Sequence, residues 1–347
     1  GDEGYVERLS GEARSARNLR RTASLDDDVA AAEIARVLLR NPEEYSLWNF
    51  RKKRLAGKFE RFLELAATAP DCEVSEERNH VLAMWSGELE LTMGAIKVHI
   101  KSYASWSHRL WTLEQGSRVD RAKYLQALHE ELALCAKVLL RDPRNFHAWV
   151  HRMTIRSRLK AAETVDLQKA SLPLEGEMKL STERIEADFA NYSAWHLRST
   201  LLSQCTPHED AEAALRREIE WVRQAYFTDP SVESTWIYHS WLMCGSVSWT
   251  WCGDEASKKS SSSHQLALCF RVEEASLREI WAEELSSLEE LEQLEPDTPR
   301  ILLAIAGTSK LLGSITRAHD LSRRLAEIDP LRQQYYLDFT SDSDITQ

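Results

Sequence analysis

The chain has 347 residues, 43% of them hydrophobic, and a formal net charge of −11 from 55 acidic and 44 basic residues. That length can bury a substantial core, whereas the acidic balance argues against a nucleic-acid-binding protein, because neutralising phosphates needs a basic surface. The six cysteines are scattered without a CxxC pair, and no signal peptide, lipidation motif or long apolar run is present, so we expect a reduced, cytoplasmic protein.

The predicted elements are helical along the whole chain. Residues 1–30 are polar, and we expect a short first helix there. Between the few glycines and prolines, apolar residues follow the i, i+3, i+4, i+7 spacing of a buried helical stripe, for example over 124–139 and 277–294. No strand-like alternation of useful length occurs, so the sequence predicts an all-α protein.

A motif of an aromatic residue, a tryptophan and usually an arginine repeats through residues 31–245. The clear copies read YSLWNFR, YASWSHR, FHAWVHR and YSAWHLR, and a fifth copy is degenerate. The tryptophans are spaced 58, 43, 46 and 41 residues apart, and are Trp48, Trp106, Trp149, Trp195 and Trp236. This period predicts an array of stacked helical hairpins. Because the rings recur at helical spacing in an acidic chain, we expect them in the core rather than as a platform for nucleic-acid bases.

Helix-start signals along the chain predict where the hairpins begin and where the array ends. An acid or asparagine precedes proline at 41–42, 142–143, 229–230, 295–296 and 329–330, and proline is well tolerated in a first helical turn. The last two starts lack the tryptophan, so residues 267–340 are expected to form capping hairpins. We expect an added loop over 68–92, a serine-rich loop or linker at 246–266 and a tail at 341–347.

Motifs that carry chemistry are scarce. The spacing of His and Cys offers no metal site, and no Gly-rich phosphate loop occurs. Most histidines near the motifs, such as His108 and His151, are expected to pack and form hydrogen bonds at helix starts. Lys101 stands out because it precedes a helix start, where free N–H groups favour an anion. A lysine there can bind phosphate, although pattern alone favours a solvated surface lysine.

The repeated Asn-Tyr/Phe-x-x-Trp-x-x-Arg motif resembles that of the protein prenyltransferase alpha-subunit family. Residues 145–149 and 191–199, together with the ending over 325–338, are similar to the Rab geranylgeranyltransferase branch. The resemblance is strong over 30–245 and weaker over 267–340. It implies a right-handed superhelical crescent, a solenoid of helical hairpins that wraps a beta subunit.

The resemblance also implies a function. In the heterodimer, geranylgeranyl would pass from its diphosphate to C-terminal cysteines of Rab small GTPases presented by a Rab escort protein. Zinc and most of the lipid pocket belong to the beta subunit, so no cofactor is expected in this chain. Lys101 matches the lysine that reaches the diphosphate. The positions expected at the substrate or subunit interface are Tyr103, Asn145, Phe146, His147 and Tyr192, and the escort protein is expected on residues 150–245.

Two alternatives stay open. One is the alpha subunit shared by farnesyltransferase and type I geranylgeranyltransferase. The other is a non-catalytic scaffold of tetratricopeptide type, which the 41–58 spacing disfavours because that repeat runs near about 34 residues. Animal Rab-type subunits carry an immunoglobulin-like insertion, which residues 246–266 would replace here, and a leucine-rich-repeat domain, whose pattern this sequence lacks.

Overall fold

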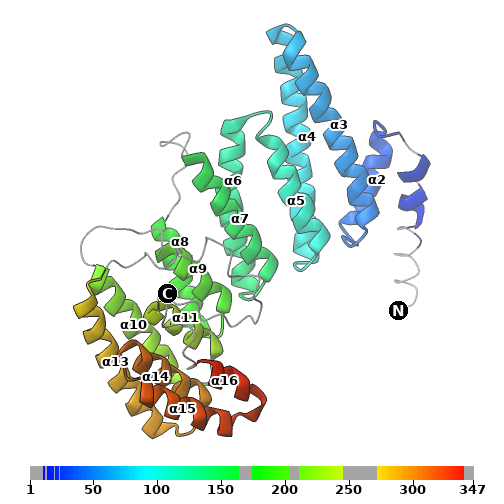
Figure 1. Ribbon diagram of the computed structural model, residues 1–347. Helices are drawn as coiled ribbons and strands as arrows, with labels where there is room; N and C mark the ends of the chain where they lie inside the picture. Colours follow the sequence, from blue (N-terminus) through cyan, green and yellow to red (C-terminus); the bar gives the residue numbers. More distant parts are fainter. Residues whose placement is uncertain are drawn as a thin grey trace. The chain divides into compact units, whose positions relative to one another are not determined.

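The computed structural model describes residues 11, 14–18, 20–22, 24–163, 174–202, 211–244 and 272–339. It divides the chain into two compact units, unit 1 (residues 1–172) and unit 2 (residues 173–347). Every regular element among the described residues is an α-helix or a short 3-10 helix, so the all-α prediction is confirmed (Figure 1). In this part of the chain no helix has both the length and the apolar character needed to cross a membrane. The predicted linker at 246–266 and the tail at 341–347 lie outside the described residues.

Unit 1 is a stack of antiparallel helices joined by short turns. Residues 14–18 and 20–22 are also helical, and Ala16 packs against Ile34 and Trp48 in a buried cluster. The main helices are α2 (Asp28–Leu38), α3 (Tyr45–Thr68), α4 (Asp71–Val98), α5 (Tyr103–Gly116), α6 (Arg121–Arg141) and α7 (Phe146–Glu163).

Unit 2 continues the same hairpin pattern and ends in helices without the motif. Its first two hairpins are α8 (Leu174–Ala187) with α9 (Tyr192–Leu202), and α10 (Ala211–Thr228) with α11 (Glu233–Cys244). Then follow α13 (Glu274–Leu294), α14 (Pro299–Leu311), α15 (Ile315–Ile328), the 3-10 helix η2 (Pro330–Arg332) and α16 (Gln333–Phe339).

The motif helices α3, α5, α7 and α9 all begin at the aromatic residue of the motif. The residue before it caps the helix in three of them, because Ser102, Asn145 and Asn191 accept the N–H of the residue three positions on. The prediction that the prolines occupy the first helical turn is wrong for most starts. Those at 42, 143, 230 and 296 lie in the preceding turns, and of these five only Pro330 opens a helix directly, the 3-10 helix η2. Pro299, which the prediction did not include, opens α14.

The tryptophans explain why those turns recur. Each of the five indole N–H groups donates to the backbone carbonyl six residues earlier, at 2.8–3.0 Å. The rings are 2–6% exposed, so each one is buried between its helix and the turn that leads into it. The indole bonds only the backbone carbonyl at that earlier position and not its side chain, so proline, isoleucine or phenylalanine can occupy the position.

The long interval between Trp48 and Trp106 comes from longer helices. The prediction of a loop over 68–92 is wrong, because α3 runs to Thr68 and α4 begins at Asp71. Figure 1 shows α3 and α4 reaching beyond the other helices of unit 1. Their extended ends stay helical because Phe59, Phe62 and Val81 are at most 2% exposed and pack into the core.

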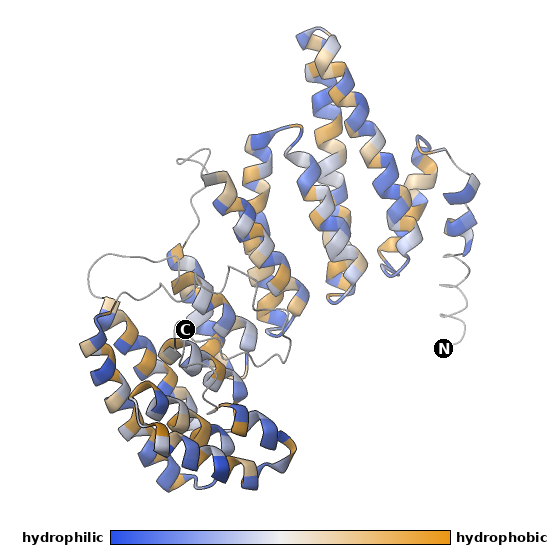
Figure 2. Cartoon of the chain, viewed as in Figure 1, coloured by the Kyte–Doolittle hydropathy of each residue, from blue (hydrophilic) through white to orange (hydrophobic). Residues whose placement is uncertain are grey.

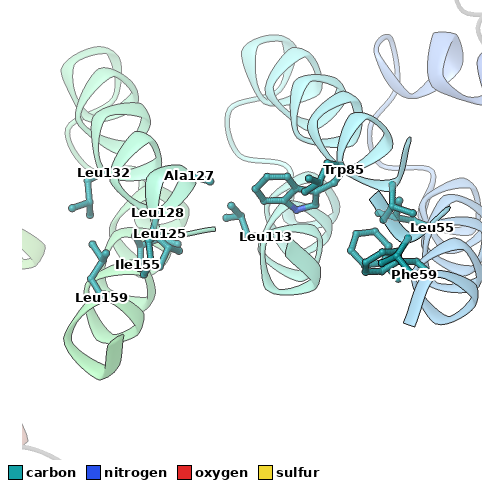
Figure 3. Close-up of a cluster of buried hydrophobic side chains, with 14 residues drawn as sticks. Leu55, Phe59, Trp85, Leu113, Leu125, Ala127, Leu128, Leu132, Ile155 and Leu159 are labelled. Carbon is teal, nitrogen blue, oxygen red and sulfur yellow. The ribbon is translucent and has the colours of Figure 1, made fainter. Parts of the chain in front are cut away.

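One hydrophobic cluster joins α3 to α7 in unit 1. Figure 3 shows side chains from these helices facing each other across the interior, among them Phe59, Trp85, Leu128 and Ile155. Colouring by hydropathy shows both apolar and polar residues along the helices (Figure 2). The packing is tight at Gly116, where an added Cβ would lie 2.5 Å from the Trp85 ring. These helices are therefore held by burial of one apolar face each.

Buried glutamates tie neighbouring motif helices of unit 1 together. Glu88 of α4 accepts Arg51 of α3 at 2.6 Å and His108 of α5 at 2.7 Å. Glu131 of α6 accepts Arg109 of α5 and His151 of α7 in the same way, at 2.7 and 2.8 Å. Burial alone would raise the pKa of Glu88, but the hydrogen bonds from His108 and Arg51 outweigh it and hold that pKa at about 2.

Unit 2 repeats the arrangement with different donors. Glu218 of α10 accepts Arg198 of α9 at 2.6 Å and the Tyr238 hydroxyl of α11 at 2.7 Å. Glu284 of α13 accepts its hydrogen bonds from Arg223, Tyr226 and His239. In both units a buried carboxylate therefore accepts hydrogen bonds from at least two side chains of neighbouring helices.

Candidate functional site

Lys101 lies in the turn between α4 and α5, at the edge of unit 1. Its side chain is 72% exposed, and its Nζ lies 3.4 Å from Oδ2 of Asp142, in the next turn of the array. Such an exposed ion pair is weak, because water screens it. The ammonium group is therefore held loosely at the surface, beside the N-terminus of α5, where a further anion can reach it.

The backbone next to Lys101 is fixed more firmly than its side chain. The carbonyl of Ile100 accepts the indole N–H of Trp106 at 3.0 Å and the Nδ2 amide of Asn145 at 3.1 Å. The same Nδ2 group also lies 3.3 Å from Oδ2 of Asp142. Asn145 is 1% exposed and caps α7 with its side-chain oxygen Oδ1, which accepts the N–H of Ala148. It therefore joins the two turns that carry Lys101 and Asp142.

An aromatic group lies next to this ion pair. The ring of His147 meets that of Tyr103 edge-on, with centroids 4.2 Å apart, and lies 4.0 Å from that of Phe146. Tyr103 and Phe146 are 60% and 47% exposed, whereas His147 is 7% exposed. Burial lowers the pKa of His147, although a hydrogen bond to the Lys101 backbone opposes the shift. The lowered pKa favours the neutral form of the His147 ring at pH 7.

Five of the six residues predicted for the site thus lie together in unit 1: Lys101, Tyr103, Asn145, Phe146 and His147. The sixth, Tyr192, opens α9 in unit 2, is 53% exposed and stacks on His196 at 6.2 Å. Sequence reasoning missed Asp142 as the partner of Lys101, because an acid before a proline indicates a helix start. It also missed the buried glutamates.

Exposed apolar side chains gather where the turns lead into motif helices. We call the turns of unit 1 at residues 39–45, 98–103 and 140–146 its turn edge. Exposed large apolar residues on it are Leu39, Tyr45, Val98, Tyr103, Leu140 and Phe146. In unit 2 the ends of the corresponding helices carry Tyr192, Phe227 and Leu294. A row of such residues is typical of a protein–protein interface.

Among the described residues, no three His, Cys, Asp or Glu side chains cluster so as to hold a metal ion. The turn edge therefore carries aromatic rings and the cations Lys101, Arg40, Arg141 and Arg144, next to the acids Glu43, Glu44 and Asp142. Such a set can bind an anion and an apolar surface side by side.

Comparison with known families supports the resemblance of the motif. The protein prenyltransferase alpha subunit repeat matches residues 85–116, 128–159 and 174–205. These segments contain Trp85, Trp106, Trp149 and Trp195.

Several relatives carry the name geranylgeranyl transferase type-2 subunit alpha. The protein of Dictyostelium discoideum is 30% identical over 315 residues, which cover 89% of this chain and 83% of that protein. The one of Sus scrofa is 32% identical over 231 residues, 65% of this chain. The one of Saccharomyces cerevisiae is 28% identical and covers 62% of this chain. The chain matches only 35% of the length of the Sus scrofa protein.

A solved structure shares the fold. Protein geranylgeranyltransferase-I of Candida albicans, in complex with GGPP, matches with a TM-score of 0.56 and 16% identity, over 94% of this chain and 88% of that one. At this level of identity the match supports the helical-solenoid fold and no finer statement.

Proposed function

Because the chain belongs to the protein prenyltransferase alpha-subunit family, we propose that it is the alpha subunit of a heterodimeric Rab geranylgeranyltransferase. The enzyme would transfer geranylgeranyl from its diphosphate to C-terminal cysteines of small GTPases presented by an escort protein. The observation that carries the proposal is Lys101, an exposed ammonium group beside the N-terminus of α5 on an aromatic edge. The relatives named type-2 subunit alpha favour the Rab branch over the alternatives.

Lys101 would act on the leaving group. The acceptor sulfur forms a bond to C1 of the geranylgeranyl group while the C1–O bond breaks, and the electron pair leaves with the diphosphate. An ammonium group beside those oxygens would stabilise the charge that develops there. The diphosphate would replace Asp142 as partner of the ammonium, since their exposed ion pair at 3.4 Å is weak.

The rest of the site would orient this lysine and bind the partner. Asn145 holds the turn of Lys101 against the start of α7. Tyr103 and Phe146 offer apolar area at the same edge, which a beta subunit would bury. Zinc is expected in that subunit, where it would favour the thiolate form of the acceptor cysteine. The chain alone would then lack both the metal and most of the lipid pocket, and we expect the heterodimer to act in the cytoplasm.

Reconstitution tests the proposal. The chain would be co-expressed with candidate beta subunits of the type-2, type-1 and farnesyl classes, and the complexes assayed for transfer from geranylgeranyl and farnesyl diphosphate. We expect transfer of geranylgeranyl only with a type-2 partner, to a Rab substrate and only with an escort protein added. Activity with the farnesyl partner would instead identify the shared alpha subunit, and failure to assemble with any partner would favour a scaffold.

A further inference from the structure

A second surface of unit 1 combines apolar and positive groups. It meets the turn edge at Ile100 and Arg141 and extends from there along α4 and α6. It is a groove of about 460 Å³ between the C-terminal halves of α4 and α6. Apolar residues line its floor: Met93, Ile96, Ile100, Ala133, Leu134 and Val138. Its volume lies in the range of grooves that bind ligands.

The rim of the groove is positive although the whole chain is acidic. Lys97, Lys137 and Arg141 line it, against a single acid, Glu130. All three basic side chains are exposed, and none forms an ion pair within the part of the chain that the structure describes. By contrast, many of the other lysines and arginines of unit 1, including Lys58, Lys101, Arg109 and Arg158, are paired with carboxylates.

Stabilisation of the helix ends accounts for only part of this charge. Lys97 and Arg141 lie in the last turns of α4 and α6, where cations favourably oppose the helix dipole. Lys137 lies a turn earlier, so its charge has little such effect. Exposed Ala133 leaves the centre of the groove open on the side of α6. The groove therefore combines an accessible apolar floor with positive charge that has no partner in the described residues.

We propose that this groove binds an acidic amphipathic helix of a partner protein. Residues 130–141 of α6 extend over about 16 Å at the helical rise, which is the length of three turns of a bound helix. Apolar anchors at i, i+3, i+4 and i+7 would enter the floor, and carboxylates on both flanks would meet Lys97, Lys137 and Arg141. The proposal does not depend on the transferase function, because none of the proposed site residues Lys101, Tyr103, Asn145, Phe146 and His147 lines the groove.

A labelled peptide tests the proposal on the full chain. The probe is a fluorescein-labelled helix of about 14 residues, with leucines at the four anchor positions and glutamates beside them. One matched peptide has lysine for every glutamate, and a second has alanine for every leucine. We expect the acidic leucine peptide to raise the anisotropy with a dissociation constant of roughly 10–100 µM, and both matched peptides to bind at least about tenfold more weakly.

Two variants locate the binding. Lys137→Glu and Ala133→Glu place a carboxylate at exposed positions in the groove and should weaken the acidic peptide about fivefold or more. Lys123→Glu makes the same charge change on α6 outside the groove and should bind the peptide as the parent does. Circular dichroism melts of all three check that they fold.

Three results would overturn the proposal. They are equal affinity for Lys137→Glu and Lys123→Glu, no binding of the acidic peptide up to roughly 1 mM, and tighter binding of the lysine peptide. Phosphatidylserine vesicles are the final comparison. Vesicle binding that is lost in Lys137→Glu, without peptide binding, would show that the groove serves a membrane surface instead.

Discussion

The interior of the array and its turn edge differ in how strictly they repeat from one copy of the motif to the next. In the interior, every copy of the motif makes the same tryptophan contact, because each indole N–H donates to the carbonyl six residues earlier. At the edge, the residue that directly follows this carbonyl is free to vary, because the indole N–H bonds only the carbonyl group before it. That position holds Glu43, Lys101, Arg144, Ala190 and Ser231 in the five copies. The repeated contacts specify the fold, and the unrepeated residue carries the proposed chemistry.

Removing a tryptophan should have the largest effect on the interior. Trp149→Ala in unit 1 and Trp195→Ala in unit 2 should each lower the free energy of unfolding by about 3–5 kcal/mol, because a large buried ring is lost. Calorimetry of each variant measures the change, and Tyr103→Ala at the exposed edge is the control, with little expected effect. An unchanged melting temperature for either tryptophan variant would contradict the assignment of these rings to the core.

Acid should weaken the interior through its buried glutamates. Glu88 and Glu284 have folded pKa values of about 2, below the ordinary value of 4.5. Their folded pKa values are depressed, so their stabilisation is complete above about pH 5 and is lost as the pH falls toward 2. Each contributes about 3 kcal/mol at pH 7 by linkage.

A glutamine variant isolates one of these carboxylates. Glu88→Gln leaves Arg51 and His108 without their buried carboxylate, so it should lower the free energy of unfolding at pH 7 by about 3 kcal/mol or more. Urea unfolding at pH 7 and pH 3 should show that the parent and the variant differ less at pH 3. The same difference at both pH values would show that the carboxylate charge does not contribute.

The asparagine caps Asn145 in unit 1 and Asn191 in unit 2 allow two matched variants to be compared. Asn145→Ala and Asn191→Ala each remove a helix cap and should lower stability by about 1 kcal/mol. Asn145 also holds the Ile100 carbonyl beside Lys101, so only Asn145→Ala should slow transfer in the heterodimer as well. We expect a loss of several-fold in the single-turnover rate, and an equal effect of both variants on that rate would contradict a positioning role for Asn145.

The sequence predicted the parts of the fold that depend on local periodicity. Helical spacing identified an all-α chain, and the motif identified the hairpins and their tryptophans. The prediction of a loop over 68–92 was wrong because the residues that follow Pro70 are mostly polar. Val74 and Val81 lie among them, and both face the hydrophobic core of unit 1 from α4. A longer helical window would have joined these two residues, which lie seven positions apart.

The site was harder to predict, because its contacts join distant residues. A buried glutamate cannot be told from a solvated one in a charged helix. A regular interval was nevertheless present, since Glu88, Glu131 and Glu218 each precede their partner on the following motif helix by 20 residues. The pair of Lys101 and Asp142 joins two turns 41 positions apart, and only the stacking of the hairpins brings them together.

The most direct test of the account compares Lys101→Ala with Lys123→Ala in the assembled heterodimer. Both lysines are exposed near the start of a helix, but only Lys101 lies on the turn edge. Single-turnover geranylgeranyl transfer should fall about 100-fold in Lys101→Ala, with folding, subunit assembly and affinity for the protein substrate unchanged. Lys123→Ala should transfer at the parent rate. A Lys101→Ala rate within about twofold of the parent would show that this lysine is an ordinary surface residue and that the chain is only a scaffold for its partner.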